Sequence, residues 1–510
     1  MRGLTRIRYT GLAGAVLLAV AAYLVARPDS GGGQGGSLGS PSGLVALAAW
    51  LSGTGLLVLA WSAAGRERPD RRWLAVTGVL WALPLLVAPP LASRDLYAYA
   101  CQGALQHAGL DPYRHGAVDL PCPWLSAVPP LWRGTPTPYG PLWLGVEDVA
   151  VAAGGTRLPV VLAVLRVAGL LGAVLIAWYG QRLAALAGGE PARALWLGAL
   201  SPVVLVHAVS GGHNDALMVG LMLAGLVAAT DTRQRTEVRT VLVGVAFGLA
   251  VAIKVTALVG LPFAALLVAG TGRWRRVLGA VAATGAAATA TFALLAGLTG
   301  RALGWLGALS DTGRLVQWTS LPSGVGMAVG YLLRLVGRSA DVATAVAVSR
   351  LIGLVTLAVA VGWLWWWARR RAADPAAVVV ATGAALTAVA LLSPVFYPWY
   401  AIAPLAVLAA APATAVRDRW LLTAGAVLAF LVLPNGLGLA VLTKLPGALL
   451  DVAFVTAAAV WLSRRRAHEA NRTSGRGPGV TRAGIKHDSP GAGPPDTVGR
   501  GPGDPRRDQA

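Results

Sequence analysis

Residues 93–100 read Ser-Arg-Asp-Leu-Tyr-Ala-Tyr-Ala, and the rest of the chain is organised around them. They follow an apolar run that ends at Pro89-Pro90, and they open the longest polar interruption in an otherwise apolar region, residues 91–156. A carboxylate in this position lies at a bilayer surface, beside a guanidinium and two aromatic rings. The sequence therefore predicts that Asp95 sits at an interface, on a platform of membrane helices.

The composition indicates a membrane protein. The chain has 510 residues, of which 56% are hydrophobic and 13% charged. Runs of about 20 apolar residues recur along most of it, which is typical of an all-α, polytopic integral membrane protein. A transmembrane β-barrel would instead show alternating segments of about ten residues, and the sequence has none. The net charge of +21 does not indicate a nucleic-acid partner, because the charges cluster at helix ends and in the C-terminal tail.

Basic loops between the apolar runs predict the topology. The loop Arg66–Arg72 and the run Arg369–Arg371 are strongly basic, and such loops stay on the cytoplasmic side. The alternation gives about 14 transmembrane helices, with both termini cytoplasmic and residues 91–156 outside. Residues 325–337 are too short and interrupted to cross, so a partial or re-entrant helix is expected there. The predicted spans are residues 10–26, 43–63, 73–90, 157–179, 194–210, 215–230, 240–253, 257–270, 277–299, 341–367, 376–393, 400–413, 420–434 and 446–463.

Three parts are expected along the chain. Residues 1–42 form an N-terminal anchor helix and a flexible outer loop rich in Gly and Ser. An anchor is preferred to a cleaved signal peptide because Val25-Ala26-Arg27 is a poor cleavage site. Residues 43–465 form the transmembrane catalytic domain. Residues 466–510 are rich in Gly, Pro and Arg and are expected to be a disordered, basic cytoplasmic tail.

The two cysteines of the chain, Cys101 and Cys122, both fall in the 91–156 loop. An extracytoplasmic loop would permit a disulfide between them. Two unpaired thiols are the alternative, and the spacing does not decide between the two.

The ionisable residues of the apolar region gather at the predicted outer surface. A proton-coupled transporter or a channel would carry such groups near the bilayer centre. The distribution instead favours an enzyme whose lipid substrate lies in the outer leaflet. Asp95 is the strongest candidate for a catalytic base. Two structural roles compete with catalysis: an ion pair with Arg94, or the N-cap of a helix over residues 96–105.

A second candidate site follows the Gly-rich run Ser210-Gly211-Gly212. Here His213, Asn214 and Asp215 precede or open a helix over residues 214–230, and the positive end of a helix is a natural place for phosphate. An Asn/Asp N-cap on an ordinary helix is the alternative. Lys254 could hold a phosphate as a point charge, or it could extend to the interface without binding anything.

No metal or soluble cofactor is expected. His107, Asp111 and His115 do not have a recognisable metal-binding spacing, and two cysteines cannot complete a zinc site. No Walker A, GxGxxG or nucleophile-elbow motif stands in a suitable context. An activated donor would therefore be linked to a lipid rather than to a nucleotide.

Three ordered motifs carry a family resemblance. They are Arg94–Tyr99 with Gln102-Gly103 and Gly109–Tyr113, then Pro138–Trp143, then Gly212–Met218. Together they resemble the actinobacterial polyprenol-phosphate-mannose-dependent α-(1→6)-mannosyltransferases of lipomannan core biosynthesis, which belong to the GT-C superfamily. The resemblance covers roughly residues 40–465.

The resemblance implies an inverting mannosyltransferase that works outside the cell membrane. Its donor would be polyprenyl-phosphate-mannose, its acceptor an oligomannoside or glycolipid, and its partners otherwise membrane lipid. The catalytic carboxylate of the superfamily lies in the first large outer loop, which corresponds to Asp95. Cys101 departs from the small residue that is usual there. A multispanning lipid or polysaccharide transporter and a non-enzymatic scaffold remain the alternatives.

The remaining site residues are assigned from charge and ring chemistry on the outer face. Residues expected to bind the donor phosphate are Lys254, His213, Arg314 and Lys444. Residues expected to contact substrate are Arg94, Tyr97, Tyr99, Gln102, Asn214, Asp215, Trp143 and Trp399. The aromatic rings could stack on sugars, although anchoring at the membrane interface explains any single ring equally well.

Overall fold

The computed structural model describes residues 2–26, 38–301, 303–311 and 315–474. Within these ranges every regular element is a helix, which confirms the all-α class. Most of the predicted flexible loop 27–42, the candidate Arg314 and nearly all of the predicted tail 466–510 lie outside the described residues.

Seven helices in the described part of the chain are long and apolar enough to cross a membrane. This agrees with a polytopic membrane protein. A bent pair, Pro191–Ala199 and Val204–Ser210, meets at 66° and would make an eighth span. The seven are α1 (Arg2–Ala26), α2 (Pro41–Glu67), α7 (Leu158–Leu186), α12 (Trp274–Thr299), α15 (Val342–Arg369), α16 (Pro375–Leu392) and the first part of α20 (Lys444–Ser474).

Shorter helices occupy the other predicted spans. Each has fewer than the roughly 20 residues that a straight span needs, so the count of about 14 spans stays a prediction. A 15-residue helix, α14 (Leu321–Leu335), stands where a partial helix was expected. The shorter helices are α3 (Arg71–Val87), α9 (Asp215–Thr230), α10 (Thr236–Val251), α11 (Leu261–Ala269), α17 (Ile402–Ala410) and α18 (Ala415–Leu428).

Small residues let the helices pack backbone against backbone. A Cβ added at Gly14 of α1 would lie 2.7 Å from the carbonyl oxygen of Gly53 in α2. A Cβ at Gly172 of α7 would lie 2.3 Å from the amide nitrogen of Leu217 in α9. Such close approach gives apolar helices extensive van der Waals contact where lipid offers no hydrophobic driving force.

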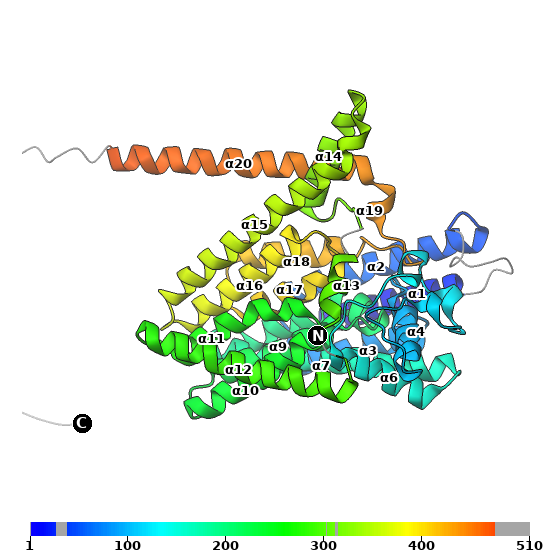
Figure 1. The fold of residues 1–510 in the computed structure, drawn as a ribbon, viewed down its shortest axis with the longest axis horizontal. Coiled ribbons are helices and arrows are strands. Elements are labelled where there is room, and N and C mark those ends of the chain that lie inside the picture. The colour runs from blue at the N-terminus through cyan, green and yellow to red at the C-terminus, as the bar shows by residue number, and fades with distance from the viewer. Residues whose placement is uncertain (1, 27–37, 302, 312–314, 475–510) are drawn as a thin grey trace, which may run out of the picture. The chain divides into compact units, whose positions relative to one another are not determined.

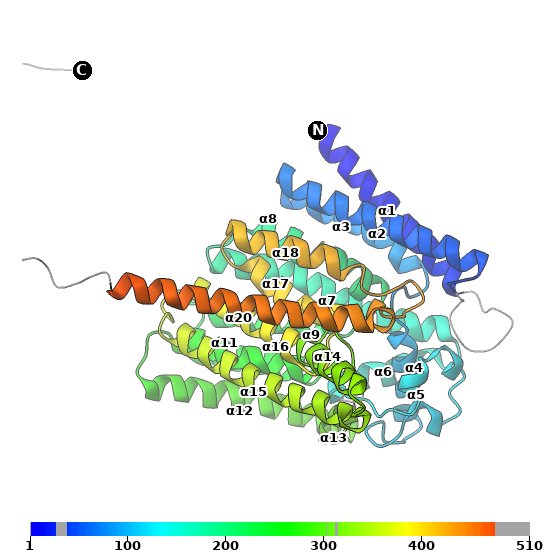
Figure 2. The same cartoon turned by 90° about the horizontal axis from the view of Figure 1, so that it is seen from above.

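The polar interruption forms its own group of short helices. These are α4 (Asp95–His107), α5 (Pro130–Arg133) and α6 (Pro141–Gly154). They lie together at one end of α7 and α12, and the α11–α12 turn lies at the other end (Figures 1 and 2). The loop before α6 is tied to the end of α10, since the Gly140 amide donates to the Ile253 carbonyl at 3.1 Å.

Arg166 of α7 fixes the chain on either side of the polar interruption. Its guanidinium donates to the carbonyls of Leu86, Ala88 and Ser210, at 2.9, 2.6 and 3.1 Å. The end of α3 and the end of the bent pair are therefore held against the same helix.

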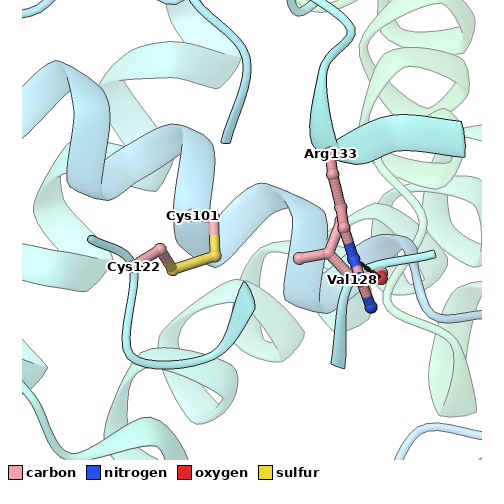
Figure 3. The surroundings of a disulfide bond; sticks show 4 residues. All are labelled: Cys101, Cys122, Val128 and Arg133. Carbon is pink, nitrogen blue, oxygen red and sulfur yellow. Dashed lines mark hydrogen bonds between the residues drawn. A yellow bond between two sulfur atoms is a disulfide. The ribbon is translucent and has the colours of Figure 1, made fainter. Parts of the chain in front are cut away.

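A disulfide closes part of the same loop. Cys101 of α4 and Cys122 are bonded, with their Cα atoms 5.6 Å apart (Figure 3). Nearby, the Arg133 guanidinium donates to the Val128 carbonyl at 2.9 Å. The sequence left open whether these cysteines form a disulfide or remain free thiols, and the structure has the disulfide.

The chain divides into two compact units. The first comprises residues 1–454 and contains all of the elements discussed below except the last part of α20. The second begins at Val455, and its described part is the remainder of α20, up to Ser474.

Candidate active site

Asp95 stands in the first turn of α4 because of the turn that precedes it. Ala92 has φ +59°, in the left-handed region, and it turns the chain sharply after Pro89-Pro90. The Ser93 hydroxyl oxygen then accepts a hydrogen bond from the Asp95 amide at 3.1 Å. The N-cap position belongs to Arg94, and the basic side chain within 4 Å of the Asp95 carboxylate is the imidazole of His213. Neither competing structural role, the N-cap or an Arg94 ion pair, is formed.

Asp95 lines a cavity of about 660 Å³. Three segments supply the polar wall: α4 with Asp95, the start of α9 with Asp215, and the turn after α10 with Lys254. Apolar side chains of α15 and α16 form another wall. The polar and aromatic lining residues are Asp95, Tyr99, Gln102, Trp132, Thr135, Tyr139, Asp215, Lys254, Thr256, Ser393, Tyr397, Trp399 and Tyr400.

His213 lies behind Asp95 rather than in the cavity. Its Nδ1 is 3.6 Å from the Asp95 Oδ2, and the ring is fully buried. The ring stacks on Trp399 at 3.8 Å, and Trp399 stacks in turn on Tyr397 at 4.5 Å. This geometry suits a residue that orients the carboxylate; it does not place the imidazole where a phosphate in the cavity would touch it.

Gly212 lets the turn that carries His213 pack closely against α4. It has φ +63°, and a Cβ there would lie 2.6 Å from Leu96. A side chain would therefore crowd Leu96 and strain the backbone at this positive φ. The backbone at Gly212 therefore lies directly against α4.

Lys254 has a buried partner. Its Nζ donates to both carboxylate oxygens of Asp215 at 2.9 Å and lies 4.0 Å from the centre of the Tyr400 ring. The Lys254 and Asp215 side chains are only 11% and 3% exposed. Each charge is therefore compensated by the other rather than by water. The Lys254 ammonium group is therefore held inside the protein by Asp215.

The environment of Asp95 suits a base. Burial raises the pKa of its carboxyl to about 6, the Lys254 ammonium opposes that shift, and the Asp215 carboxylate adds to it. A carboxylate with this pKa is ionised near neutral pH and is a stronger base than an exposed aspartate.

Two further predicted residues line the cavity from α4. The Tyr99 hydroxyl donates to the Tyr139 hydroxyl at 3.4 Å, and the Gln102 side-chain oxygen accepts from Thr137 at 3.2 Å. Trp399 also lines it. Tyr139, Tyr397 and Tyr400 were not singled out from the sequence. The signal was present for Tyr139, which stands inside the Pro138–Trp143 motif.

Other predicted residues lie away from the cavity. Trp143 is fully buried and packs edge-on against Tyr99 at 5.2 Å, so its ring has no face for a sugar. Asn214 is also fully buried, and its amide group has no hydrogen-bond partner in the described part of the chain. Lys444 is exposed at the start of α20.

Tyr97 faces a different hollow, and Arg94 lies beside its ring. The Arg94 guanidinium lies 5.9 Å from the Tyr97 ring. Tyr97 lines a hollow of about 530 Å³ together with Tyr23 and Arg166. The first turn of α4 therefore presents Asp95 to one side and Tyr97 to another.

Metal ligands do not gather at the site. Among the described residues no three His, Cys, Asp or Glu side chains come close enough to hold a metal ion. His107 pairs with Asp148 at 2.9 Å, and His115 with Asp119 at 3.5 Å. That the protein works without a metal or cofactor stays a prediction.

The fold and the site together define a class: a membrane protein that places a raised-pKa carboxylate and a buried ammonium around one cavity at the ends of its helices. Family comparisons are more specific. Residues 8–270 match the family model described as "Alpha-(1->6)-mannopyranosyltransferase, N-terminal domain", and residues 322–465 match "MptB C-terminal domain". The chain belongs to the alpha-(1->6)-mannopyranosyltransferase family, as the sequence motifs predicted.

The names of similar proteins agree with this assignment. Alpha-(1->6)-mannopyranosyltransferase A of Mycobacterium tuberculosis is 36% identical over 72% of this chain and 71% of its own length. A probable alpha-(1->6)-mannopyranosyltransferase of Mycolicibacterium smegmatis is 33% identical over 80% and 79%. Alpha-(1->6)-mannopyranosyltransferase A of Corynebacterium glutamicum is 31% identical over 62% and 66%. No solved structure matches the chain.

Proposed function

We propose that this protein is an inverting glycosyltransferase of the GT-C type. It moves mannose from polyprenyl-phosphate-mannose to a primary hydroxyl of an oligomannoside or glycolipid and forms an α-(1→6) linkage, as in lipomannan core assembly. The observation that carries the proposal is Asp95, a buried carboxylate with a raised pKa that lines the same cavity as Lys254. The names of the relatives supply the sugar and the linkage.

Asp95 is the base in this mechanism. Its carboxylate removes the proton from the acceptor hydroxyl while the oxygen attacks the anomeric carbon of mannose. The bond from that carbon to the phosphate oxygen breaks in the same displacement, so a β-linked donor gives an α-linked product. The transition state resembles an oxocarbenium ion, and the phosphate departs with the bonding electrons.

Lys254 stabilises the departing phosphate. The charge that develops on the leaving oxygen needs a positive group fixed in place beforehand. Asp215 and the Tyr400 ring hold the ammonium at the cavity wall, and the N-terminal end of α9 adds a partial positive charge. Arg314 remains a further candidate from the sequence.

The polyprenyl chain of the donor lies along the apolar wall. Leu354 of α15 and Leu386 and Val389 of α16 line the cavity, and such a surface suits a long hydrocarbon. A donor held in this way reaches Asp95 without leaving the bilayer.

The proposal places the cavity outside the cell membrane and both termini inside, with about 14 spans. Asp215 lies at the start of α9, and the basic segment Asp231–Arg239 begins just after its end. The 16 residues of α9 span about 24 Å, so the cavity and the basic loop lie toward opposite membrane surfaces. The Cys101–Cys122 disulfide also suits an oxidising compartment.

Radiolabelled mannose transfer tests the function. Membranes containing the protein are supplied with an α-linked oligomannoside and either polyprenyl-phosphate-mannose or GDP-mannose, with the endogenous conversion of one donor to the other blocked. We expect extension of the acceptor by α-(1→6)-linked mannose from the lipid donor alone, unchanged by EDTA. Transfer from the nucleotide sugar alone, or loss of transfer in EDTA, contradicts the proposal.

The pKa of Asp95 predicts the pH dependence. Only the ionised carboxylate can accept a proton, and the pKa is about 6. We expect kcat/KM to be constant above that pH and to fall about tenfold for each unit below it. Initial rates between about pH 4.5 and 8, with tryptophan fluorescence as a check on folding, measure this. A constant rate down to about pH 5 removes Asp95 from the role of base.

A further inference from the structure

Six arginines gather where α11 turns into α12 and α15 ends. They are Arg273, Arg275, Arg276, Arg369, Arg370 and Arg371. The two segments lie side by side at the end of the bundle away from α4 and α6 (Figures 1 and 2). We call these residues, with Trp274 and Trp366, the arginine–tryptophan cluster.

Direct contacts join the two segments. The Arg369 guanidinium donates to the Gly272 carbonyl at 3.3 Å and lies 4.6 Å from the centre of the Trp274 ring. Trp274 in turn stacks on Trp366, with ring centres 5.9 Å apart. Arg370 lies over Trp366 at 4.9 Å. The ends of α12 and α15 therefore form one continuous surface, with guanidinium groups positioned over indole rings.

The positive charge of the cluster is uncompensated. Within the described part of the chain no carboxylate lies within 4 Å of any of the six arginines. The arginine ion pairs that the chain does form include those of Arg193, Arg233 and Arg338, which lie outside the cluster. Asp374, the nearest acidic residue in sequence to Arg371, accepts from the Ala376 amide and caps α16. The N-terminus of α12 has no side-chain cap, which adds the positive end of a 26-residue helix.

Apolar side chains flank the charges on the same two helices. Leu278 of α12 is 60% exposed, and Val359 and Trp363 of α15 are 67% and 61% exposed. Guanidinium groups above exposed hydrocarbon match the two halves of a phospholipid, a phosphate head group and acyl chains. We propose that the arginine–tryptophan cluster binds the head group of an anionic phospholipid, at the opposite end of the protein from Asp95.

A second arginine run provides a matched control. Arg464-Arg465-Arg466 also follows an apolar helix, and Arg465 lies over Trp461 at 4.0 Å. If the arginines serve only to orient helices in the membrane, the two runs are equivalent. If they form a site, the run at the end of α15 matters more, because Arg369 contacts Gly272 and Trp274 at the start of α12.

Native mass spectrometry and thermal stability of the purified full chain test the site. The probes are phosphatidylglycerol, phosphatidylcholine and inorganic phosphate, added to wild type and to the triple variants R369Q/R370Q/R371Q and R464Q/R465Q/R466Q. We expect phosphatidylglycerol alone to bind and to raise the unfolding temperature, in wild type and in the second variant. The first variant should bind it roughly a hundredfold more weakly, because each arginine near an anionic lipid contributes about fivefold.

Three outcomes overturn the proposal. One is equal binding of phosphatidylcholine, another is the same thermal shift from inorganic phosphate, and the third is equal loss in the two triple variants. If R369Q/R370Q/R371Q does not fold, the exposed pair R275Q/R276Q replaces it, and unchanged phosphatidylglycerol binding in that variant counts against the site. Mannose transfer is not used as the readout, so failure here leaves the proposed function untouched.

Discussion

Replacing Asp95 with asparagine is expected to lower the rate of mannose transfer about 1,000-fold, within the range that general-base catalysis contributes. Asparagine has nearly the same shape, and it keeps the first turn of α4 and the volume of the cavity. It cannot accept the proton of the acceptor hydroxyl. The protein should therefore insert and fold normally, and the donor should bind as before.

Single-turnover transfer in detergent, with equal amounts of folded wild type and D95N, measures the effect. The matched control is Asp148→Asn, which removes a carboxylate that is 40% exposed and paired with His107. D148N should retain the wild-type rate. A D95N rate above about one tenth of wild type would show that another group removes the proton.

Replacing Lys254 with methionine is expected to abolish transfer and also to destabilise the protein. The substitution removes the only cation that the cavity lining provides among the described residues, and it leaves the Asp215 carboxylate buried without a partner. Breaking a buried ion pair in this way costs about 3–5 kcal/mol. Less folded protein and a lower unfolding temperature should accompany the loss of transfer.

The double variant D215N/K254M separates the two effects. It contains neither charge of the pair, so much of the stability should return, whereas transfer should not. Thermal unfolding and single-turnover transfer on the same preparations distinguish these roles. A double variant that transfers mannose would mean that neither Lys254 nor its partner stabilises the departing phosphate.

Helix positions and the place of Asp95 were readable from the sequence for a physical reason. Lipid-facing helices must be apolar over their whole length, so a carboxylate after Pro89-Pro90 stands out at the end of such a run. The same reasoning placed Asp215 and Lys254 on one surface. Their pairing was not predicted, because it depends on how the start of α9 meets the end of α10.

Aromatic residues show where the sequence was insufficient. Trp143 and Tyr139 are neighbours in one motif, and both are residue types that are common at a membrane interface. Only the packing of α6 against α4 decides that Trp143 is buried under Tyr99 while Tyr139 lines the cavity. His213 was likewise assigned to phosphate. Its stacking on Trp399 was not predicted, because the two residues are 186 positions apart in the sequence.

The apolar wall of the cavity bears on side reactions of the donor. A glycosyl phosphate can also be cleaved by hydrolysis, and water is smaller than any sugar alcohol. The apolar part of the cavity wall offers water no side-chain hydrogen bonds; it includes Leu315, Leu354 and Leu386. On the proposed function, few solvent molecules stand near the anomeric carbon, and each activated sugar ends in polymer rather than as wasted free mannose.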